Sequence, residues 1–176
     1  MNRRTNNSPG SANAEVVKQL WEILEEVPDP EVPVLSVVDL GVVRNVSVVQ
    51  LNDEEHVVID ITPTYSGCPA MDMIAMNIRM TLLQHGFVNV KLNTILSPAW
   101  TTDWMSENGK QKLKAFGIAP PAGKALDQAF LETLQVECPL CHSTDTKLVS
   151  QFGSTSCKAL FQCNDCKEPF DHFKCH

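Results

Sequence analysis

The spacing of hydrophobic residues changes along the chain from helical to strand-like and back again. Residues 13–27 carry apolar side chains at helical intervals, and Pro28 is expected to stop this helix because proline lacks the N–H that an α-helix needs. Residues 42–50 and 56–62 are rich in β-branched side chains and are separated by a short polar segment. These two runs predict a β-hairpin.

After the hairpin, the pattern predicts a helix, a strand and a shorter helix, over residues 69–85, 87–96 and 107–116. Gly86 and Gly117 follow the two helices, and glycine commonly ends a helix. A small number of strands with helices to cover them favours two layers. We therefore expect the α+β class, with a two-layer domain built on a three-stranded sheet.

The composition divides the chain into four parts. The first eleven residues are polar and lack the apolar segment of a signal peptide, so they predict a disordered tail. A segment rich in proline and glycine near residue 121 is typical of a domain boundary. The expected parts are the tail, the α+β domain, a linker and a small cysteine-rich domain, over residues 1–11, 12–121, 122–137 and 138–176. Most of the linker, residues 124–137, is mildly amphipathic and predicts a connecting helix.

The net charge of −7 comes entirely from the first 137 residues, since residues 138–176 hold four basic and four acidic side chains. No basic patch is present, and clustered Lys and Arg are what phosphate backbones require. No run approaches the roughly 18 apolar residues of a membrane-spanning helix. We therefore expect a cytoplasmic protein that binds neither nucleic acid nor membrane.

Six of the seven cysteines lie in the last 39 residues, and four of these form two CxxC pairs. In a cytoplasmic protein such pairs indicate metal binding or redox chemistry more often than disulfides. The 21 residues between the pairs leave room for a hairpin, so both pairs are predicted to bind one zinc ion tetrahedrally. Bound iron or an iron–sulfur cluster is the first alternative, and two disulfides are the second. The predicted ligands are Cys138, Cys141, Cys163 and Cys166.

This zinc is expected to be structural. A site with four thiolates has no open position for a substrate, and 39 residues are too few to fold on a hydrophobic core alone. Two further cysteines of this region, Cys157 and Cys175, are candidate extra ligands for a second metal. The alternative is that Cys157 packs as a small apolar side chain and that Cys175 is solvated.

Cys68 is the only cysteine before residue 138. Pro69 suits the first position of a helix, which predicts Cys68 as the N-cap, facing free N–H groups and the positive end of the helix dipole. A thiolate there would be a nucleophile or a ligand for a soft metal, whereas a buried thiol would be inert. Asp29, Glu31 and Asp39 form a second candidate group, as acid–base or metal-binding carboxylates or as caps of turns and helix ends.

Three motifs follow one another in the first domain: Asp29–Pro33, Val38–Val43 and the segment from Thr62 to Pro69. Together they resemble the SufT-like domain of iron–sulfur assembly factors, and the resemblance covers roughly residues 13–121. It implies that the family's reactive cysteine corresponds to Cys68 and its acidic loop to Asp29 and Glu31. In the cysteine-rich part, Phe152–Lys158 and Glu168–Phe170 resemble the D subunits of phenylacetyl-CoA epoxidase systems.

This second resemblance implies an accessory subunit in bacterial phenylacetate degradation. Its implied partners are the oxygenase subunits, which resemble carboxylate-bridged diiron proteins, and the iron–sulfur reductase subunit. The implied cargo is iron or an iron–sulfur cluster, held transiently. The chain lacks the Glu-x-x-His pairs of a diiron site and a GxGxxG dinucleotide motif, so we expect a maturation factor rather than an oxidising enzyme.

One cysteine cannot hold a cluster, because a two-iron cluster usually takes four thiolates. We therefore expect either a homodimer that shares Cys68, or further ligands from the client protein, Cys157 or Cys175. A second hypothesis is a thiol enzyme with Cys68 as nucleophile, which would need a general base within hydrogen-bond reach. His56 and His85 are the histidines of the first domain, and both are expected to lie far from Cys68. A third is a module that only docks other proteins.

Overall fold

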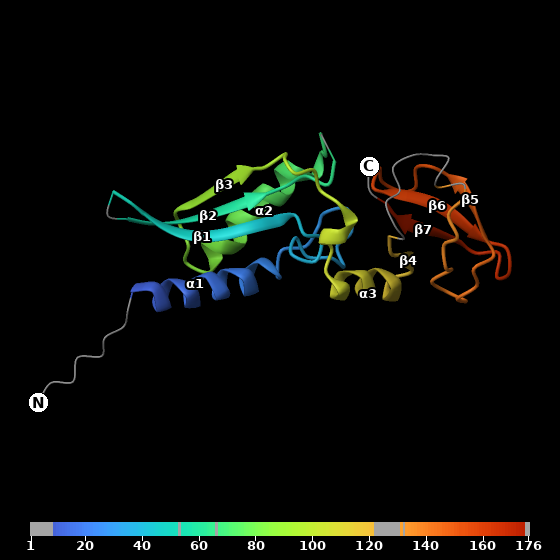
Figure 1. Cartoon of the computed structure of the whole chain (residues 1–176), viewed down its shortest axis with the longest axis horizontal. Coiled ribbons are helices and arrows are strands. Elements are labelled where there is room, and N and C mark those ends of the chain that lie inside the picture. The colour runs from blue at the N-terminus through green and yellow to red at the C-terminus, as the bar shows by residue number, and fades with distance from the viewer. Residues whose placement is uncertain (1–8, 53, 66, 122–130, 132, 175–176) are drawn as a thin grey trace, which may run out of the picture.

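The computed structural model describes residues 9–52, 54–65, 67–121, 131 and 133–174, which form two sheets with helices packed on the first (Figure 1). The strand order is β1-β2-β3 in the first sheet and β4-β7-β6-β5 in the second. This confirms the α+β class and the three-stranded sheet of the first domain. The second sheet belongs to the cysteine-rich part.

The first sheet combines a hairpin with a crossover. β1 (Val43–Leu51) and β2 (Glu54–Ile61) pair antiparallel, as predicted. β3 (Val90–Thr94) pairs parallel with β2, and α2 (Ala70–Gln84) makes the connection between them. Such a parallel pair needs a crossover of this kind, which explains why a helix follows the hairpin directly.

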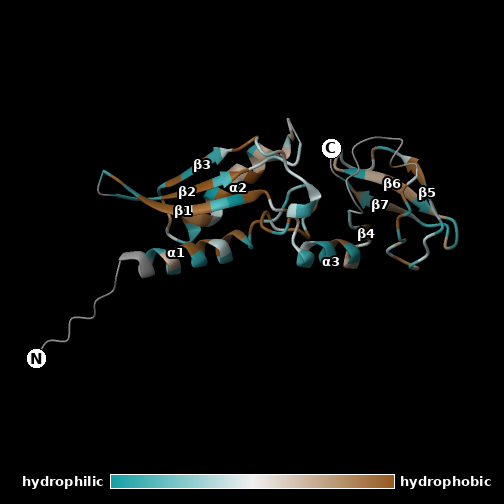
Figure 2. Cartoon of the chain, viewed as in Figure 1, coloured by the Kyte–Doolittle hydropathy of each residue, from teal (hydrophilic) through white to brown (hydrophobic). Residues whose placement is uncertain are grey.

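Two helices pack against each other and contribute to the core of the first domain. α1 (Pro9–Leu24) contacts β1 and α2. Hydrophobic and hydrophilic residues alternate along α1 (Figure 2), and its Leu20 and Leu24 are fully buried. The helix begins earlier and ends earlier than predicted, so residues 9–11 belong to it and not to a tail. Residues 1–8 lie outside the described part of the chain.

Two short helical elements follow the first sheet. A single turn, η1 (Thr102–Trp104), and α3 (Glu107–Ala115) follow β3. The hydroxyl of Ser106 accepts a hydrogen bond of 2.8 Å from the N–H of Gly109 and thereby caps α3.

The second sheet begins before the predicted domain boundary. Its strands are β4 (Ile118–Ala119), β5 (Thr146–Ser150), β6 (Lys158–Cys163) and β7 (Pro169–Phe173). β4 pairs parallel with β7, so residues that we expected in the first domain form an edge of the second sheet. The predicted linker and its connecting helix fall largely on residues 122–130 and 132, which lie outside the described residues.

The two domains share a hydrophobic core. Cys157 and Phe173 lie in the second domain by sequence, yet both pack into the core of the first. Phe173 is 1% exposed and meets Trp100 edge to face, with 6.5 Å between ring centroids. A separate, smaller core lies inside the second domain around Phe161. The second domain is therefore anchored to the first by buried contacts.

Candidate functional site: a thiolate quartet and a cleft between the domains

The four predicted zinc ligands lie together. The Sγ atoms of Cys138, Cys141, Cys163 and Cys166 all lie within 4.8 Å of one another. Cys138 and Cys166 are 3.8 Å apart, and Cys141 and Cys163 are 3.5 Å apart. Zinc–sulfur bonds of about 2.3 Å in a tetrahedron place the sulfurs about 3.8 Å apart, so the quartet fits this ion.

Two turns hold the quartet in place. Cys138 and Cys141 lie at the two ends of the turn before β5. Cys163 is the last residue of β6, and Cys166 lies in the turn that joins β6 to β7. Asn164 joins the two turns through hydrogen bonds of its backbone N–H and side-chain amide to Asp145, at 2.8 and 2.7 Å. All four ligand positions are occupied by thiolates, so zinc here would stabilise the fold and leave no position for a substrate.

A second group of candidate residues meets in a cleft between the domains. Cys68, Asp29 and Glu31 of the first domain line this cleft together with Cys157 of the second. The interior wall is apolar and includes Ile74 from α2. The structure therefore brings four of the predicted candidates together from three separate segments of the chain.

Cys68 lies in the tight turn that leads into α2. Gly67 has φ +82°, a conformation that glycine adopts without strain, and the N–H of Cys68 donates to the carbonyl of Tyr65 at 3.2 Å. The predicted N-cap role is wrong, because the capping position is Pro69 and no side chain caps this end. The carbonyl of Cys68 accepts from Met71, three residues on, so the first turn is tighter than an α-helix and α2 starts one residue later.

Asp29 shapes the acidic loop. Its Oδ1 accepts hydrogen bonds from the backbone N–H groups of Glu31 and Val32, at 2.9 and 2.7 Å. Burial raises the pKa of Asp29, and these two hydrogen bonds oppose the rise. Asp29 therefore combines a turn-forming role with a place in the cleft wall.

Glu31 is the carboxylate that reaches the second domain. The Cys157 thiol donates to Glu31 Oε2 at 3.4 Å and lies 3.0 Å from Thr155 Oγ1. Burial raises the pKa of the Cys157 thiol to about 12. Glu31 adds to this rise, whereas the hydrogen bond with Thr155 opposes it. Cys157 therefore packs in the core, as one of its two interpretations predicts, and it also lines the cleft. Its role as an extra metal ligand stays a prediction. Cys175 lies outside the described residues.

Asp39 lies elsewhere and fastens the loop after α1 to α3. It is 1% exposed, and its carboxylate accepts from Ser106 Oγ at 2.7 Å and from Lys112 Nζ. Burial would raise the pKa of Asp39, but the hydrogen bonds from Lys112, Ser106 and the Ser36 backbone outweigh it and hold the pKa below its ordinary value. Asp39 is not among the residues that line the Cys68 cleft.

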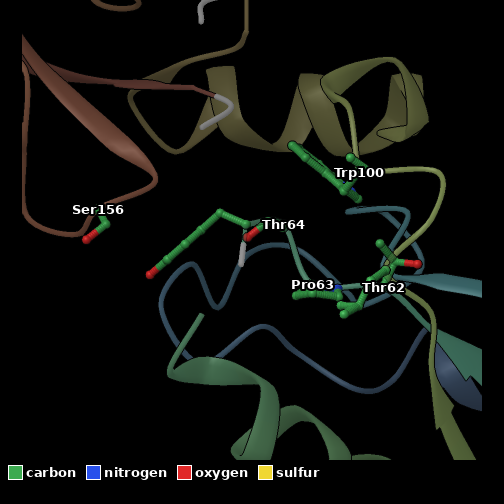
Figure 3. A pocket seen from close by; sticks show the side chains of 8 residues that line it. Thr62, Pro63, Thr64, Trp100 and Ser156 are labelled. Carbon is green, nitrogen blue, oxygen red and sulfur yellow. The ribbon is translucent and has the colours of Figure 1, made fainter. Parts of the chain in front are cut away.

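A larger cavity of about 410 Å³ adjoins the cleft (Figure 3). Thr64 lines both hollows, and Ser156 reaches the larger one from the second domain. Burial raises the pKa of Tyr65 in this wall, with Cys68 as the next cause and a hydrogen bond with Ser156 opposing it. Sequence reasoning missed Thr64 and Ser156 as cavity residues, although both lie within the motifs that carry the family resemblances.

The two histidines considered as bases lie away from Cys68. His85 follows α2 at its far end, where its Nε2 lies 3.2 Å from Glu26 Oε2, and His56 pairs with Val49 in the hairpin. Neither lines the cleft. Within the described residues, no helix is both long and apolar enough to cross a membrane.

Comparisons with protein families divide the chain as the two sheets suggest. Residues 18–91 match the family described as iron-sulfur cluster assembly protein, and residues 123–174 match the family described as PaaD zinc beta ribbon domain. The second match agrees with the quartet of thiols. The first spans the cleft residues Asp29, Glu31 and Cys68.

Individual relatives agree with this division. A protein of Escherichia coli K12, provisionally named as the D subunit of 1,2-phenylacetyl-CoA epoxidase, is 49% identical over 90% of this chain and 93% of its own length. An Fe-S protein maturation auxiliary factor of Porphyromonas gingivalis is 37% identical over 54% of this chain and 89% of its own. The crystal structure of a DUF59 domain from Bacillus anthracis is 27% identical, covers 59% of this chain and 96% of its own, and superposes with a TM-score of 0.53.

Proposed function

Because this chain belongs to the family of phenylacetyl-CoA epoxidase D subunits, we propose that it matures the epoxidase system by carrying iron or an iron–sulfur cluster to a client protein. An accessory or maturation role follows from the assembly-type domain and the family membership together. The cargo, the client and the residues that handle them are the proposal. The clients are the oxygenase subunits or the iron–sulfur reductase of the same system.

The meeting of Cys68, Glu31 and Cys157 in one cleft carries this proposal. Thiolates and carboxylates are iron ligands, and the hydrogen bond of 3.4 Å between Cys157 and Glu31 already joins the second domain to the acidic loop. The ribbon thus adds a second thiol to the one that the assembly domain provides.

The cleft suits a transient cargo. Among the described residues, the ribbon quartet is the group of three or more Cys, His, Asp or Glu side chains with ligand atoms within 4.8 Å of one another, so the cleft residues do not form a closed site. A two-iron cluster takes four thiolates, and the cleft offers two. The missing ligands would come from the client, and a shared set of ligands favours transfer.

The test compares metal content and maturation in matched cysteine variants. Cells that lack the native protein are complemented with the parent chain, Cys68→Ser or Cys157→Ser, and each protein is purified without oxygen for iron, sulfide and zinc analysis. We expect Cys68→Ser to lose iron and epoxidase activity, and Cys157→Ser to retain less iron than the parent chain.

Zinc content is the internal control, because neither variant touches the quartet and both should keep about one zinc per chain. Full epoxidase activity with Cys68→Ser would contradict the proposal and would leave a docking role without cluster transfer. Loss of zinc in either variant would show that the substitution disturbs the fold.

A further inference from the structure

α2 has a second apolar face, which points away from the sheet. Its buried residues include Ile74, Ile78 and Leu82, which pack into the core. The opposite side of the helix carries four large apolar side chains that are about half exposed. These are Met73 (47%), Met76 (49%), Met80 (52%) and Leu83 (57%), which we call the methionine face.

The spacing of these residues places them in one stripe. They follow one another at intervals of three, four and three residues, so they share a face of the helix. Methionine is flexible and polarisable, and it is common on surfaces that bind other proteins. Contiguous exposed apolar residues of this kind mark interaction surfaces.

The charges of α2 identify the partner. The helix contains two charged residues, Asp72 near its start and Arg79 seven residues later, both exposed and both on one edge of the methionine face. Neither forms an ion pair with another side chain in the described part of the chain. The two charges are opposite in sign and lie two helical turns apart.

We propose that a second copy of this chain docks on the methionine face, with the two α2 helices antiparallel about a twofold axis beside Met76. This arrangement places Asp72 of each copy opposite Arg79 of the other, and it brings the two Met76 side chains together. A twofold interface uses the same patch on both copies, so the patch must be complementary to itself. The order of the two charges meets this condition for antiparallel helices, whereas parallel helices would oppose like charges.

The contact is a modest one. Stable interfaces bury about 1,200–2,000 Å² of accessible surface, and a single pair of helices buries less than this. We therefore expect a dimer that dissociates on dilution. The opposite charges select the antiparallel register, and the methionines supply the apolar contact area.

This dimer separates the two clefts. Cys68 lies before the start of α2, about 7.5 residues from the twofold axis, so the two Cys68 residues would lie about 22 Å apart along the paired helices. The dimer that we infer therefore does not share one cluster between two Cys68 residues. Each cleft stays free for its own client.

Charge swaps test the register directly. We would measure the dimer dissociation constant of the full chain by sedimentation equilibrium for the parent, Asp72→Arg, Arg79→Asp and the double variant. Each single variant opposes like charges twice and should weaken association at least tenfold. The double variant and a 1:1 mixture of the two single variants both restore opposite pairs, so both should associate as the parent does.

Matched variants control for net charge. Asp103→Arg and Lys91→Asp make the same changes at exposed positions outside α2 and should leave the dissociation constant unchanged. Met76→Glu should abolish association without affecting the fold, because this side chain points away from the core. A parent chain that stays monomeric at all concentrations, or single variants that fail to recover on mixing, would overturn the proposal and leave the face to a different protein.

Discussion

At the scale of single residues, two aspartates of neighbouring motifs acquire opposite properties from their surroundings. Asp29 and Asp39 are both buried, but burial dominates at Asp29, whose pKa is raised, whereas ion pairing and hydrogen bonds dominate at Asp39, whose pKa is lowered. The sequence places both in one candidate group. Only the structure shows that Asp29 lines the cleft and that Asp39 is a structural anchor.

Asp39→Asn should lower the free energy of unfolding by about 2 kcal/mol at pH 7, because Lys112 and Ser106 lose their charged partner. Lys112 is 37% exposed, which keeps the cost below that of a fully buried pair. A pKa lowered by folding means that the carboxylate stabilises the fold above its unfolded pKa of about 3.9, and that this stability is lost as pH falls through the lower folded value.

The gap between Asp39→Asn and the parent chain should therefore narrow between pH 5 and pH 2. Urea titrations of both proteins across this range would measure it, and Asp103→Asn, at an exposed position, is the control. A gap that stays constant with pH would show that the charge of Asp39 does not contribute.

At the scale of elements, the sequence predicts the helices and strands whose hydrophobic pattern repeats over many residues. The hairpin and α2 follow from hydrophobic periodicity, and Ser106 and Gly117 mark the ends of α3. β4 has two residues and no period to detect, and its pairing with β7 depends on chain segments far apart. The sequence pattern does not predict the start of α1, because Pro9 and Gly10 are typical of a loop, although proline is tolerated in the first turn of a helix.

The two candidate sites also differ in how far apart their residues lie in the sequence. The quartet could be predicted because the two CxxC pairs are local signals with a known ligand geometry. The cleft could be predicted only in part, because the contact between Cys157 and Glu31 joins residues 126 positions apart. Nothing in the spacing of these two residues indicates their contact.

Cys141→Ser should reduce bound zinc to well below one per chain, since one of four thiolates is lost and the site cannot close. Elemental analysis after dialysis measures the metal, and Cys68→Ser, which lies outside the quartet, is the control. A full complement of zinc in Cys141→Ser would contradict the assignment of the four ligands.

At the scale of the whole molecule, the two domains are coupled through buried side chains. Phe173 and Cys157 belong to the second domain by sequence but pack in the core of the first. Conversely, β4 precedes the second domain in the sequence but pairs with β7 in its sheet. The cleft lies at this junction, so its geometry depends on both domains.

Phe173→Ala should destabilise both domains, at a cost of about 3–5 kcal/mol for a buried phenylalanine. Phe170→Ala is the matched control, because Phe170 is buried within the ribbon's own core and its loss should affect the ribbon first. Hydrogen exchange measured separately in α2 and in β6 would show which domain each substitution destabilises. Unchanged protection of α2 in Phe173→Ala would show that the domains are energetically independent.

The position of β7 in the chain also has a consequence for synthesis. β7 follows every other described element, and it supplies the partner strand of β4 and the phenylalanine that packs on Trp100. A nascent chain usually folds its domains in the order in which they emerge. Here the N-terminal domain lacks part of its core until β7 leaves the ribosome, so neither domain can reach its final packing first, and the cleft forms only when both are complete.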